Sequence, residues 1–463
     1  MDSAAGKTLA FCRDLTIVVA MDWYLLIGAT AILAQLLVVY YALANYHYVT
    51  TRLASKRAPF YRPRAALIVP CKGLDTRFTA NIRSFLEQDY ENYYLLFVVG
   101  NESDPAYKEL MILKNEWGVP RWRGSSRLPS DVLRSEPRNR PTLDAGCAVC
   151  GETPAYGPLD VQVLVAGPSQ SSSQKIHNLL HALSRVPADS EVLAFADSDV
   201  CVHEDWLRHL VHPLYVTKRG LTTGYRWFVP TDNNLASLAA SAINAAVAQF
   251  LGNGLFNLAW GGSMAIRTQD FHRFGIPELW SQTLSDDLSL SRAVRRAGLR
   301  ITFVPQCLVA SFESFTWRRL CEFGRRQFLI TRVYTPGVWW LGLFSTLGSV
   351  LGMWGAAAAA IYAGAVHGEH MVLYAAVALV FFTGQVTRAV LRQIATVRAL
   401  REHLSPLFPA AVADVLGCWF WSIVLFTLML SSAFGRTIRW RGIRYRLVSP
   451  TDIRILNKGS QTR

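Results

Sequence analysis

The sequence predicts a mixed α/β domain inserted between an N-terminal membrane helix and a C-terminal bundle of membrane helices. Three observations lead to this prediction. The mean hydropathy of the 463 residues is positive, at +0.20. Apolar residues gather near the N-terminus and throughout the last third of the chain. The middle alternates short apolar runs with helical patterns, which is typical of an α/β sheet.

The first membrane helix is expected at residues 23–45. This stretch carries no charge and is long enough to cross a hydrocarbon core of about 30 Å. Because it lacks a basic start and a small-residue cleavage site, we interpret it as an anchor rather than a removed signal. A basic run follows directly and predicts that the middle domain is cytosolic. This run contains Arg52, Lys56, Arg57, Arg62 and Arg64.

Three further candidate spans lie at 338–366, 371–390 and 408–433. Basic residues between the last two indicate a cytosolic loop, and they are Arg388, Arg392, Arg398, Arg401 and His403. Three crossings place the C-terminus outside, whereas the basic segment RTIRWRGIRYRL favours the cytosolic side. Either 338–366 is a hairpin, or 404–433 is partly interfacial, or the tail breaks the rule.

Another apolar stretch, 234–258, is interrupted by Asn244, Gln249, Asn253 and Asn257. No basic cluster flanks it. We therefore expect a helix that packs within the domain or lies at the membrane surface, rather than a span.

The α/β domain is expected at 64–333, between an N-terminal segment and span at 1–50 and membrane helices at 336–434. A basic tail at 435–463 closes the chain. The predicted strands are 65–70, 93–100, 161–167 and 191–199, and the predicted helices are 75–88, 174–185 and an interfacial helix at 316–333.

Residues 116–160 interrupt this alternation. They are rich in Pro, Gly, Ser and Arg and show no sustained period, which indicates an irregular insertion. They contain the C-x-x-C pair Cys147 and Cys150. A redox or metal role is one interpretation, and two unpartnered thiols in a reducing cytosol is the favoured one.

The formal net charge is +14. Much of the excess lies beside the predicted spans, where basic residues set topology and contact lipid headgroups. No recognisable nucleic-acid-binding module accompanies these residues, so we expect no nucleic-acid partner.

Asp197 and Asp199 follow the apolar run VLAFA, at the end of a predicted strand. Ligands of open α/β sheets collect beyond the carboxyl ends of the strands. Two carboxylates one residue apart can present oxygens to Mg²⁺ or Mn²⁺, which would neutralise a leaving nucleoside diphosphate. The alternative is an ordinary acidic turn.

Asp286 and Asp287 lie at the start of a predicted helix. One interpretation is helix capping by Ser285 or Asp286, because acidic residues in the first turn are favoured by the helix dipole. The other is a carboxylate that projects into a cleft and deprotonates an acceptor hydroxyl as a general base. The sequence order alone favours capping and leaves both open.

Arg325, Arg326 and Gln327 precede the next predicted span. They fit a basic interfacial helix bound to lipid headgroups. They also fit a site in which an arginine contacts a pyrophosphate, because the planar guanidinium suits phosphate oxygens. One segment is able to do both.

With these residues in view, the chain resembles the family 2 inverting glycosyltransferases of GT-A fold, and most closely their ceramide glucosyltransferase branch. The resemblance is ordered, covers about 64–333 and includes the flanking spans. Six motifs carry it: ALIVPCKGLD (66–75), GNESDPA (100–106), SQKIHNLL (173–180), FADSDV (195–200), WGGSMAIR (260–267) and SDD (285–287).

The resemblance implies a role for each motif. It places the donor nucleotide sugar against Pro70, Lys72, Gly73, Glu102 or Asp104, Lys175 with Asn178, Asp197 and Arg326. It assigns Mg²⁺ or Mn²⁺ to Asp197 and Asp199. It places the acceptor against Trp260, Gly261, Gly262, Asp286 and Gln327. Asp287 is the expected catalytic base.

The last motif departs from the family pattern, which usually reads Q/R-x-x-R-W. Here the matching segment is FGRRQ, with Arg326 at the arginine and Gln327 where tryptophan is expected. The choice between Arg325 and Arg326 stays open. The change keeps a phosphate-binding cation and loses an aromatic platform, which disfavours a processive polymer synthase.

The implied function is inverting transfer of a single sugar, with glucose expected, from a UDP-sugar to the hydroxyl of a ceramide-like membrane lipid. The Ala- and Arg-rich composition favours a bacterial inner membrane over a Golgi or endoplasmic reticulum membrane. The enzymatic alternatives are N-acetylglucosaminyl transfer to a hopanoid or other lipid, and polysaccharide synthesis. A transporter or membrane scaffold is the non-enzyme alternative, and it is disfavoured because Asp414 is expected to be a lone charge in the spans.

Overall fold

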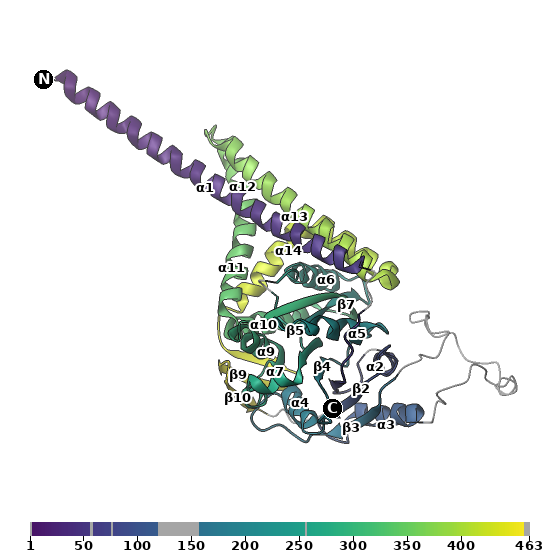
Figure 1. Cartoon of the computed structure of the whole chain (residues 1–463). Coiled ribbons are helices and arrows are strands. Elements are labelled where there is room, and N and C mark those ends of the chain that lie inside the picture. Colours follow the sequence, from purple (N-terminus) through teal and green to yellow (C-terminus); the bar gives the residue numbers. More distant parts are fainter. Residues whose placement is uncertain (1, 56–58, 76, 119–156, 255–256, 458–463) are drawn as a thin grey trace.

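The computed structural model describes residues 2–55, 59–75, 77–118, 157–254 and 257–457. The expectations for most of the insertion at 116–160, including Cys147 and Cys150, lie outside the described residues. Within the described part, the α/β region forms one body and the long apolar helices project from one side of it (Figure 1).

A seven-stranded sheet forms the centre of the α/β region, in the order β3–β2–β1–β4–β6–β5–β7. Strands β3, β2, β1 and β4 run parallel, β6 is antiparallel to both β4 and β5, and β7 is parallel to β5. The strands are β1 (Ala65–Pro70), β2 (Tyr93–Val99), β3 (Asp160–Val165), β4 (Val192–Ala196), β5 (Arg219–Pro230), β6 (Ser263–Arg267) and β7 (Arg300–Glu313). The four predicted strands correspond to β1–β4.

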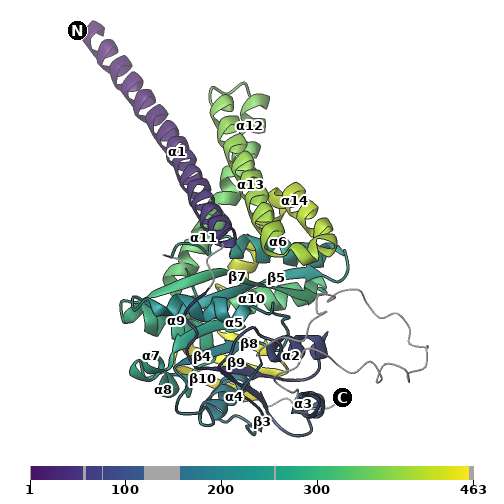
Figure 2. The same ribbon diagram turned by 45° about the vertical axis from the view of Figure 1, so that its right-hand side comes forward.

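Helices cover both faces of this sheet, as an α/β fold requires (Figure 2). Leu67 and Ile68 are consecutive residues of β1, so their side chains point to opposite faces of the sheet. Both are fully buried, each in a different core. These helices are α2 (Phe78–Leu86), α3 (Pro105–Gly118), α4 (Gln174–Leu183), α5 (Trp206–Val211), the 3₁₀ turn η2 (His212–Tyr215), α7 (Thr268–Arg273), α8 (Ile276–Trp280) and α9 (Asp286–Arg296). The predicted α/β class is confirmed.

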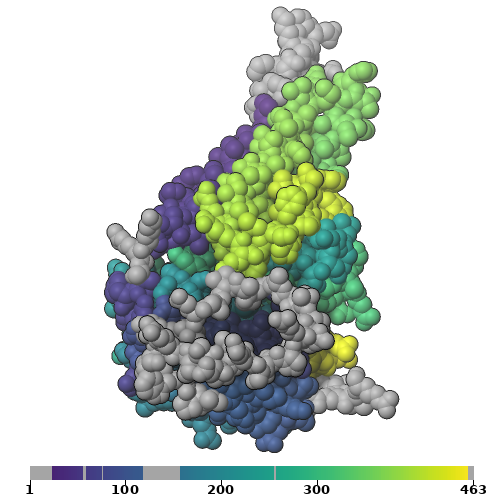
Figure 3. All heavy atoms as spheres, turned by 90° about the vertical axis from the view of Figure 1, so that its right-hand side faces the viewer, coloured from purple at the N-terminus to yellow at the C-terminus, as the bar shows by residue number. Residues whose placement is uncertain are grey.

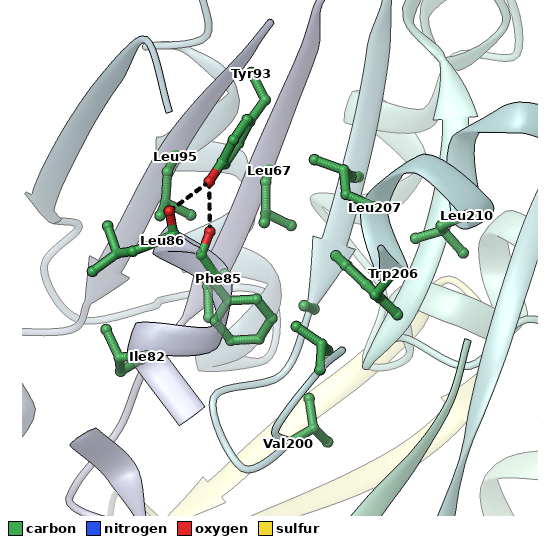
Figure 4. Close-up of a cluster of buried hydrophobic side chains, with 14 of the residues drawn as sticks. Leu67, Ile82, Phe85, Leu86, Tyr93, Leu95, Val200, Trp206, Leu207 and Leu210 are labelled. Atoms are coloured by element: carbon green, nitrogen blue, oxygen red, sulfur yellow. Dashed lines mark hydrogen bonds between the residues drawn. The ribbon is translucent and has the colours of Figure 1, made fainter. Parts of the chain in front are cut away.

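One of the two cores illustrates how the sheet and helices are joined (Figure 4). Phe85 of α2 and Trp206 of α5 make an edge-to-face contact at 6.1 Å between ring centroids. The hydroxyl of buried Tyr93 donates to the carbonyl oxygens of Phe85 and Leu86 at 2.8 and 3.1 Å. The end of α2 is therefore fixed against β2, which positions the loop between β1 and α2.

Four helices are long and apolar enough to cross a membrane: Trp23–Leu53, Pro336–Ala365, Met371–Ala399 and Arg401–Ser431. The four predicted stretches are thereby confirmed as candidate spans. The first is part of α1 (Asp2–Leu53), and the second is α11 (Pro336–Val350), a π-helical turn η3 (Leu351–Gly355) and α12 (Ala356–Ala365). The others are α13 (Met371–Ala399), and η4 (Arg401–His403) with α14 (Leu404–Ser431).

Both ends of α14 contact the α/β region. Near its start, Leu407 packs with Trp227 and Val229 of β5. Just beyond its end, the carbonyl of Ala433 accepts a hydrogen bond from Arg332. In Figure 3, α13 and α14 lie side by side, and α13 extends away from the α/β region. Both ends of α14 therefore lie at the α/β region, and the three alternatives for 338–366, 404–433 and the tail stay predictions.

The predicted loop containing Arg388, Arg392 and Arg398 is wrong, because all three belong to helix α13. The side chain of Arg392 forms a two-pronged ion pair with Asp414 of α14, which is fully buried. Asp414 is therefore not a lone charge. Because Asp414 on the neighbouring helix compensates the charge of Arg392, the apolar helix α13 can continue through this arginine.

The apolar stretch at 234–258 forms α6 (Leu235–Ala248), which packs between β5 and α14. Fourteen residues extend only about 21 Å, short of a hydrocarbon core of about 30 Å. The Asn244 side chain, which interrupts the apolar pattern, accepts a hydrogen bond of 3.1 Å from the backbone of Phe228. This is the packed helix that the sequence favoured over a span.

The predicted basic tail is a folded element. Its strands are β8 (Thr437–Trp440), β9 (Ile443–Ser449) and β10 (Asp452–Asn457), which form an antiparallel sheet in the order β10–β9–β8. Ile438, Tyr445 and Leu447 are buried against the helix α10 (Trp317–Tyr334). The alternation of these apolar residues with arginines gives the strand one buried and one charged face.

Candidate active site

The candidate site lies where β1 and β4 end side by side. The two strands are parallel neighbours, so their carboxyl ends meet at one edge of the sheet. The hydroxyl of Ser198, after β4, donates to the Asp75 carboxylate, after β1, at 3.3 Å. The side-chain amide of Asn81 donates to the Ser198 carbonyl at 3.0 Å. The loops after the two strands therefore form one unit.

Lys175 joins the acidic turn after β4 to the start of α9. Its Nζ lies 2.8 Å from Oδ1 of Asp197 and 3.0 Å from Oδ2 of Asp286. Burial alone would lower the pKa of Lys175, but the carboxylates of Asp197, Asp286 and Asp287 outweigh burial and raise the pKa above its ordinary value. The two acidic pairs predicted from distant motifs thus share one cation.

The start of α4 explains why Lys175 reaches Asp286. Ser173 is the N-cap of α4, and its hydroxyl accepts a hydrogen bond from the backbone of Ile176. The same hydroxyl donates to the carbonyl of Leu284 at 3.1 Å. Since Leu284 precedes Asp286 by two residues, this bond ties α4 to the start of α9. Asn178 of the same motif is buried and bonds Gln174 and the β2 backbone, which is a supporting contact.

Asp287 is half-buried and is held by hydrogen bonds on both carboxylate oxygens. Its Oδ2 accepts from the backbone N–H of Gly261 at 3.1 Å. Its Oδ1 accepts from the Ser285 hydroxyl and from the backbone N–H of Leu288. Ser285 is the N-cap of α9. Helix capping and a place for Asp287 beside the acceptor-side loop therefore coexist.

The loop at residues 260–262, which the sequence predicts to face the acceptor and which we call the acceptor-side loop, approaches these acids so closely that it requires glycine. A Cβ at Gly261 would lie 2.3 Å from Oδ2 of Asp286 and 2.8 Å from Nζ of Lys175. A Cβ at Gly262 would lie 2.2 Å from the Trp260 ring. That ring packs edge-to-face on Tyr225, with ring centroids 5.9 Å apart. The WGG motif is thus explained by contact with the two acids and the tryptophan.

Asp199 has the properties of a cation ligand. Its Oδ1 is buried and has no hydrogen-bond partner among the described residues. Its Oδ2 lies 4.0 Å from Nη1 of Arg226. Burial, together with the charge of Asp197, raises the pKa of Asp199 to about 6. A divalent cation would coordinate the unpartnered Oδ1 of Asp199 and lower the pKa of this carboxyl group.

The described residues contain no group of three His, Cys, Asp or Glu side chains that could hold a metal ion by themselves. A cation bound to Asp197 and Asp199 would take its remaining ligands from a diphosphate and water, as Mg²⁺ does in nucleotide sites. Burial acts to raise the pKa of Asp197, but Lys175 and Arg226 outweigh it, so the pKa is lowered overall. The acidic pair therefore fits the predicted Mg²⁺ or Mn²⁺.

Asp286 is buried beside its charged neighbours. Burial raises the pKa of Asp286 to about 6. The negative charges of Asp287 and Asp197 also raise this pKa, whereas the ion pair with Lys175 lowers it. Asp286 is therefore a poor ionised base, since its carboxylate is enclosed and already faces Lys175. Asp287, half-buried and in contact with the acceptor-side loop, is better placed to receive a proton.

The predicted nucleotide loop follows β1, which ends at Pro70. Gly73 has a φ of +70°, a conformation that favours glycine, and its N–H donates to Oδ1 of Asp104 at 2.8 Å. The same oxygen accepts from the N–H of Ala106 at the start of α3. Glu102 is exposed and makes no hydrogen bond or ion pair with the described residues. Of the two candidates, Asp104 is the one tied to the loop.

The C-terminal sheet reaches the same loop through Arg441, in the turn between β8 and β9. The Arg441 guanidinium donates to the carbonyl of Lys72 at 2.7 Å and lies 3.7 Å from the Asp75 carboxylate. The Lys72 ammonium donates to the carbonyl of Arg441 at 3.4 Å. Burial and the charge of Arg441 lower the pKa of Lys72. The tail is therefore part of the site.

Helix α10 presents Arg326 to the site. Its guanidinium lies 5.3 Å from the Phe323 ring and 5.9 Å from the Trp440 ring. It makes no hydrogen bond or ion pair with the described residues. Burial, with the charges of Arg226 and Arg441, lowers the pKa of Arg326 to about 10. A bound anion such as a diphosphate would compensate the positive charges of Arg226, Arg326 and Arg441.

The neighbouring residues of α10 have different surroundings. Arg325 donates to the carbonyls of Phe434 and Thr437 at 2.8 and 3.1 Å and so anchors the tail. Arg326, rather than Arg325, thus faces the site. Gln327 stands where the family pattern has tryptophan, and the ring of Trp440 from the tail lies beside Arg326 instead.

Sequence reasoning missed three residues of the site, namely Asp75, Arg226 and Arg441. Arg226 lies in β5, where its guanidinium packs on the rings of Phe228, Trp260 and Phe323 at 4.8, 5.6 and 5.4 Å. An arginine inside an otherwise apolar strand was the signal available for it. Arg441 was included only in a basic tail, because no local pattern places that tail over the nucleotide loop.

Two of the solved structures to which the chain shows similarity are glycosyltransferases of low identity. The mannosyltransferase PcManGT from Pyrobaculum calidifontis, solved with GDP-Man and Mn²⁺, is 15% identical over 88% of this chain and 97% of its own, with a TM-score of 0.40. The glucosyl-3-phosphoglycerate synthase from Mycobacterium tuberculosis, solved with Mn²⁺ and UDP-glucose, is 13% identical over 61% of this chain and 80% of its own, with a TM-score of 0.31.

The sequence model described as glycosyl transferase family 21 matches residues 30–118 and 147–453. The match includes every site residue discussed above, most of the first long apolar helix and all of the other three. The resemblance to ceramide glucosyltransferases is confirmed at the level of the family. The chain therefore belongs to glycosyl transferase family 21, the GT-A family of the ceramide glucosyltransferases.

Proposed function

We propose that this protein transfers one glucose from UDP-glucose to the hydroxyl of a ceramide-like membrane lipid, with inversion at the anomeric carbon. Family membership makes the chain a sugar transferase. The observation that carries the proposal is the convergence of Asp197 and Asp286 on Lys175, with Asp287 next to the acceptor-side loop. The motif resemblance supports the choice of glucose and ceramide.

The donor would bind at the carboxyl ends of β1 and β4. Asp197 and Asp199 would hold Mg²⁺ or Mn²⁺, which neutralises the diphosphate when bound. Arg326 supplies a guanidinium that forms no ion pair with the described residues and is lined by the Phe323 and Trp440 rings. The loop held by Asp104 would contact the uridine or ribose. Positive charge around the diphosphate favours its departure with the bonding electrons.

Asp287 would act on the acceptor. Its carboxylate takes the proton from the lipid hydroxyl while the hydroxyl oxygen forms the new bond to the anomeric carbon. The bond to the diphosphate oxygen breaks on the opposite face, which inverts the configuration. The hydrogen bonds from Gly261, Ser285 and Leu288 fix the carboxylate for this transfer. A positioned base of this kind contributes about 10²–10⁴-fold to the rate.

The position of α10 supports a lipid acceptor. Arg326 precedes Pro336, the first residue of α11, by one stretch of helix that spans about 15 Å at 1.5 Å per residue. The site is thus within reach of a headgroup at the membrane surface. If α11–α12 and α13 each cross once and α14 lies along the surface, the tail returns to the side of the catalytic domain. The basic residues after α1 support a cytosolic location for that side.

The function is tested with membranes that contain the full chain, Mn²⁺, ceramide and radiolabelled UDP-glucose, UDP-galactose or UDP-N-acetylglucosamine. Lipid extracts are separated and the labelled product is weighed by mass spectrometry. The expected product is ceramide plus one hexose, formed from UDP-glucose and absent with the Asp287→Asn variant. Label in a polymer, or in a lipid only with UDP-N-acetylglucosamine, would contradict the proposal.

A further inference from the structure

A cavity of about 90 Å³ lies between the long apolar helices, outside the site described above. Its walls come from α1, α6, α11, α13 and α14. Since one water needs about 10–15 Å³ of such space, the cavity can hold a group of several heavy atoms. Its polar lining includes Gln249, Ser345, Ser349, Gln385, Arg388 and Arg392.

The charges around this cavity are unbalanced. Arg392 is paired with Asp414 through two hydrogen bonds, and the side-chain amide of Gln393 donates to the same carboxylate at 2.7 Å. The Asp414 carboxylate is therefore already compensated by Arg392 and does not neutralise a second arginine. Arg388, one turn before Arg392 on α13, has a buried Nε without a hydrogen-bond partner, and its guanidinium makes no ion pair within the described residues. One positive charge remains uncompensated.

An uncompensated guanidinium between membrane helices is costly, and such groups usually mark a ligand site. The planar guanidinium matches phosphate oxygens, and the nearby serine hydroxyls can donate to the same group. The arginines are also on the domain side of α13, whose last residue is Ala399. This is the end at which lipid headgroups would lie if α13 crosses a bilayer.

The cavity around Arg388 also carries apolar side chains, among them Val38, Ile243 and Leu425. A cation without an ion pair among apolar side chains, between helices long enough to cross a membrane, matches a molecule with an anionic head and an apolar tail. A second cavity shares Ala42, Gln249 and Arg392 with the first and continues toward β5 and β7 of the α/β region, so it leads away from the membrane side of Arg388.

We propose that the cavity around Arg388 binds the phosphate-bearing headgroup of an anionic membrane lipid, whose acyl chains lie along the apolar helices. This lipid is distinct from the acceptor of the sugar, because the site is built around a net positive charge. The proposal does not depend on the identity of the donor or the acceptor.

The test uses the purified full chain in a neutral detergent and follows thermal unfolding while phosphatidylglycerol or phosphatidylcholine is added. A ligand that binds only the folded state raises the unfolding temperature. We expect phosphatidylglycerol to raise it and phosphatidylcholine to leave it unchanged. Arg388→Gln should weaken the apparent affinity for phosphatidylglycerol by about tenfold, the loss of a charged hydrogen bond. Arg388→Lys should retain most of it.

Two controls separate this site from general charge effects. Arg401→Gln removes the same charge from an exposed position just after α13 and should bind lipid like the wild type. Ser349→Phe should fill the cavity and abolish the response without changing the charge. Native mass spectrometry of the wild-type protein provides a measurement that needs no variant, with retained phosphatidylglycerol expected.

The proposal is overturned if Arg388→Gln responds to phosphatidylglycerol like the wild type. It is also overturned if phosphatidylcholine stabilises the protein equally, which would indicate a site for neutral lipids. A response to inorganic phosphate equal to that to phosphatidylglycerol would show a soluble anion as the ligand. Absence of retained phosphatidylglycerol in the wild-type mass spectrum would contradict the proposal even if no variant folds.

Discussion

Arg441 donates a hydrogen bond of 2.7 Å to the backbone carbonyl of Lys72, across nearly the whole length of the chain. The bond closes the C-terminal sheet over the loop that follows β1. The same arginine lies 3.7 Å from Asp75, whose carboxylate contacts the acidic turn through Ser198. The tail is thereby coupled to the proposed donor site, although it follows the last apolar helix.

Arg441→Ala should weaken binding of UDP-glucose by about tenfold, because one charged hydrogen bond to the loop is lost. The turnover rate at saturating donor should change much less, since Arg441 does not contact Asp287. The matched control is Arg444→Ala, which removes an exposed arginine from β9 of the same sheet. The measurement is the KM for UDP-glucose. Equal KM values for the two variants would show that the tail has no part in donor binding.

Asp199→Asn should weaken Mn²⁺ binding in the presence of UDP, because the amide removes a negatively charged ligand from a pair of two carboxylates. The loss is expected to be about tenfold or greater. A titration of Mn²⁺ against the stability of the UDP complex measures it. Asp205→Asn is a suitable control, since that acid is held by His203 and Arg208 away from the site. An unchanged Mn²⁺ midpoint for Asp199→Asn would contradict the assignment.

Metal-dependent donor binding should decline as the pH falls through about 6. The pKa of Asp199 is raised to about 6 by burial and by Asp197, so its carboxylate is protonated below that pH and ionised above it. Because a cation competes with that proton, its affinity should be constant above pH 7 and fall by about tenfold per pH unit well below 6. Asp286 also has a pKa raised to about 6. Asp286→Asn should therefore keep the transition, and Asp199→Asn should lose it.

Gly261→Ala should reduce turnover by at least about tenfold while the protein remains folded. The new Cβ would lie 2.3 Å from the Asp286 carboxylate and 2.8 Å from the Lys175 ammonium, so these groups must move. Gly337→Ala is the control, since nothing lies within 4 Å of a Cβ at that position. Comparison of the two transfer rates, with thermal unfolding as a check on folding, tests the close approach. Equal rates would show that the acceptor-side loop tolerates a side chain.

Much of the fold could be predicted from the sequence, since strong local patterns specify it. The apolar runs of β1 and β4 and the uncharged stretch after Trp23 each fit one element type. The position of α14 could not be predicted in this way. Its composition is that of a span, and only its contacts with β5 and α10 show that both ends lie against the domain.

The same distinction between local patterns and long-range contacts applies to the candidate site. Asp197, Lys175 and Asp287 occur in short motifs, so the sequence reveals them one by one. Their convergence depends on the bond between Ser173 and Leu284, which no motif contains. Arg226 is brought in by a strand in which its isolated charge is the only signal, and Arg441 by a turn whose sequence shows no pattern of its own. Contacts between distant segments are set by packing, and one sequence carries little information about them.

The central claim is that Asp287 removes the proton from the acceptor while other residues bind the donor. The most direct test is the single-turnover rate of Asp287→Asn with saturating UDP-glucose, ceramide and Mn²⁺, together with its affinity for UDP. We predict a rate lower by about 10²–10⁴-fold, the usual contribution of a general base, with UDP affinity unchanged within about twofold. A variant that retains more than about a tenth of the wild-type rate when chemistry is limiting would contradict the claim.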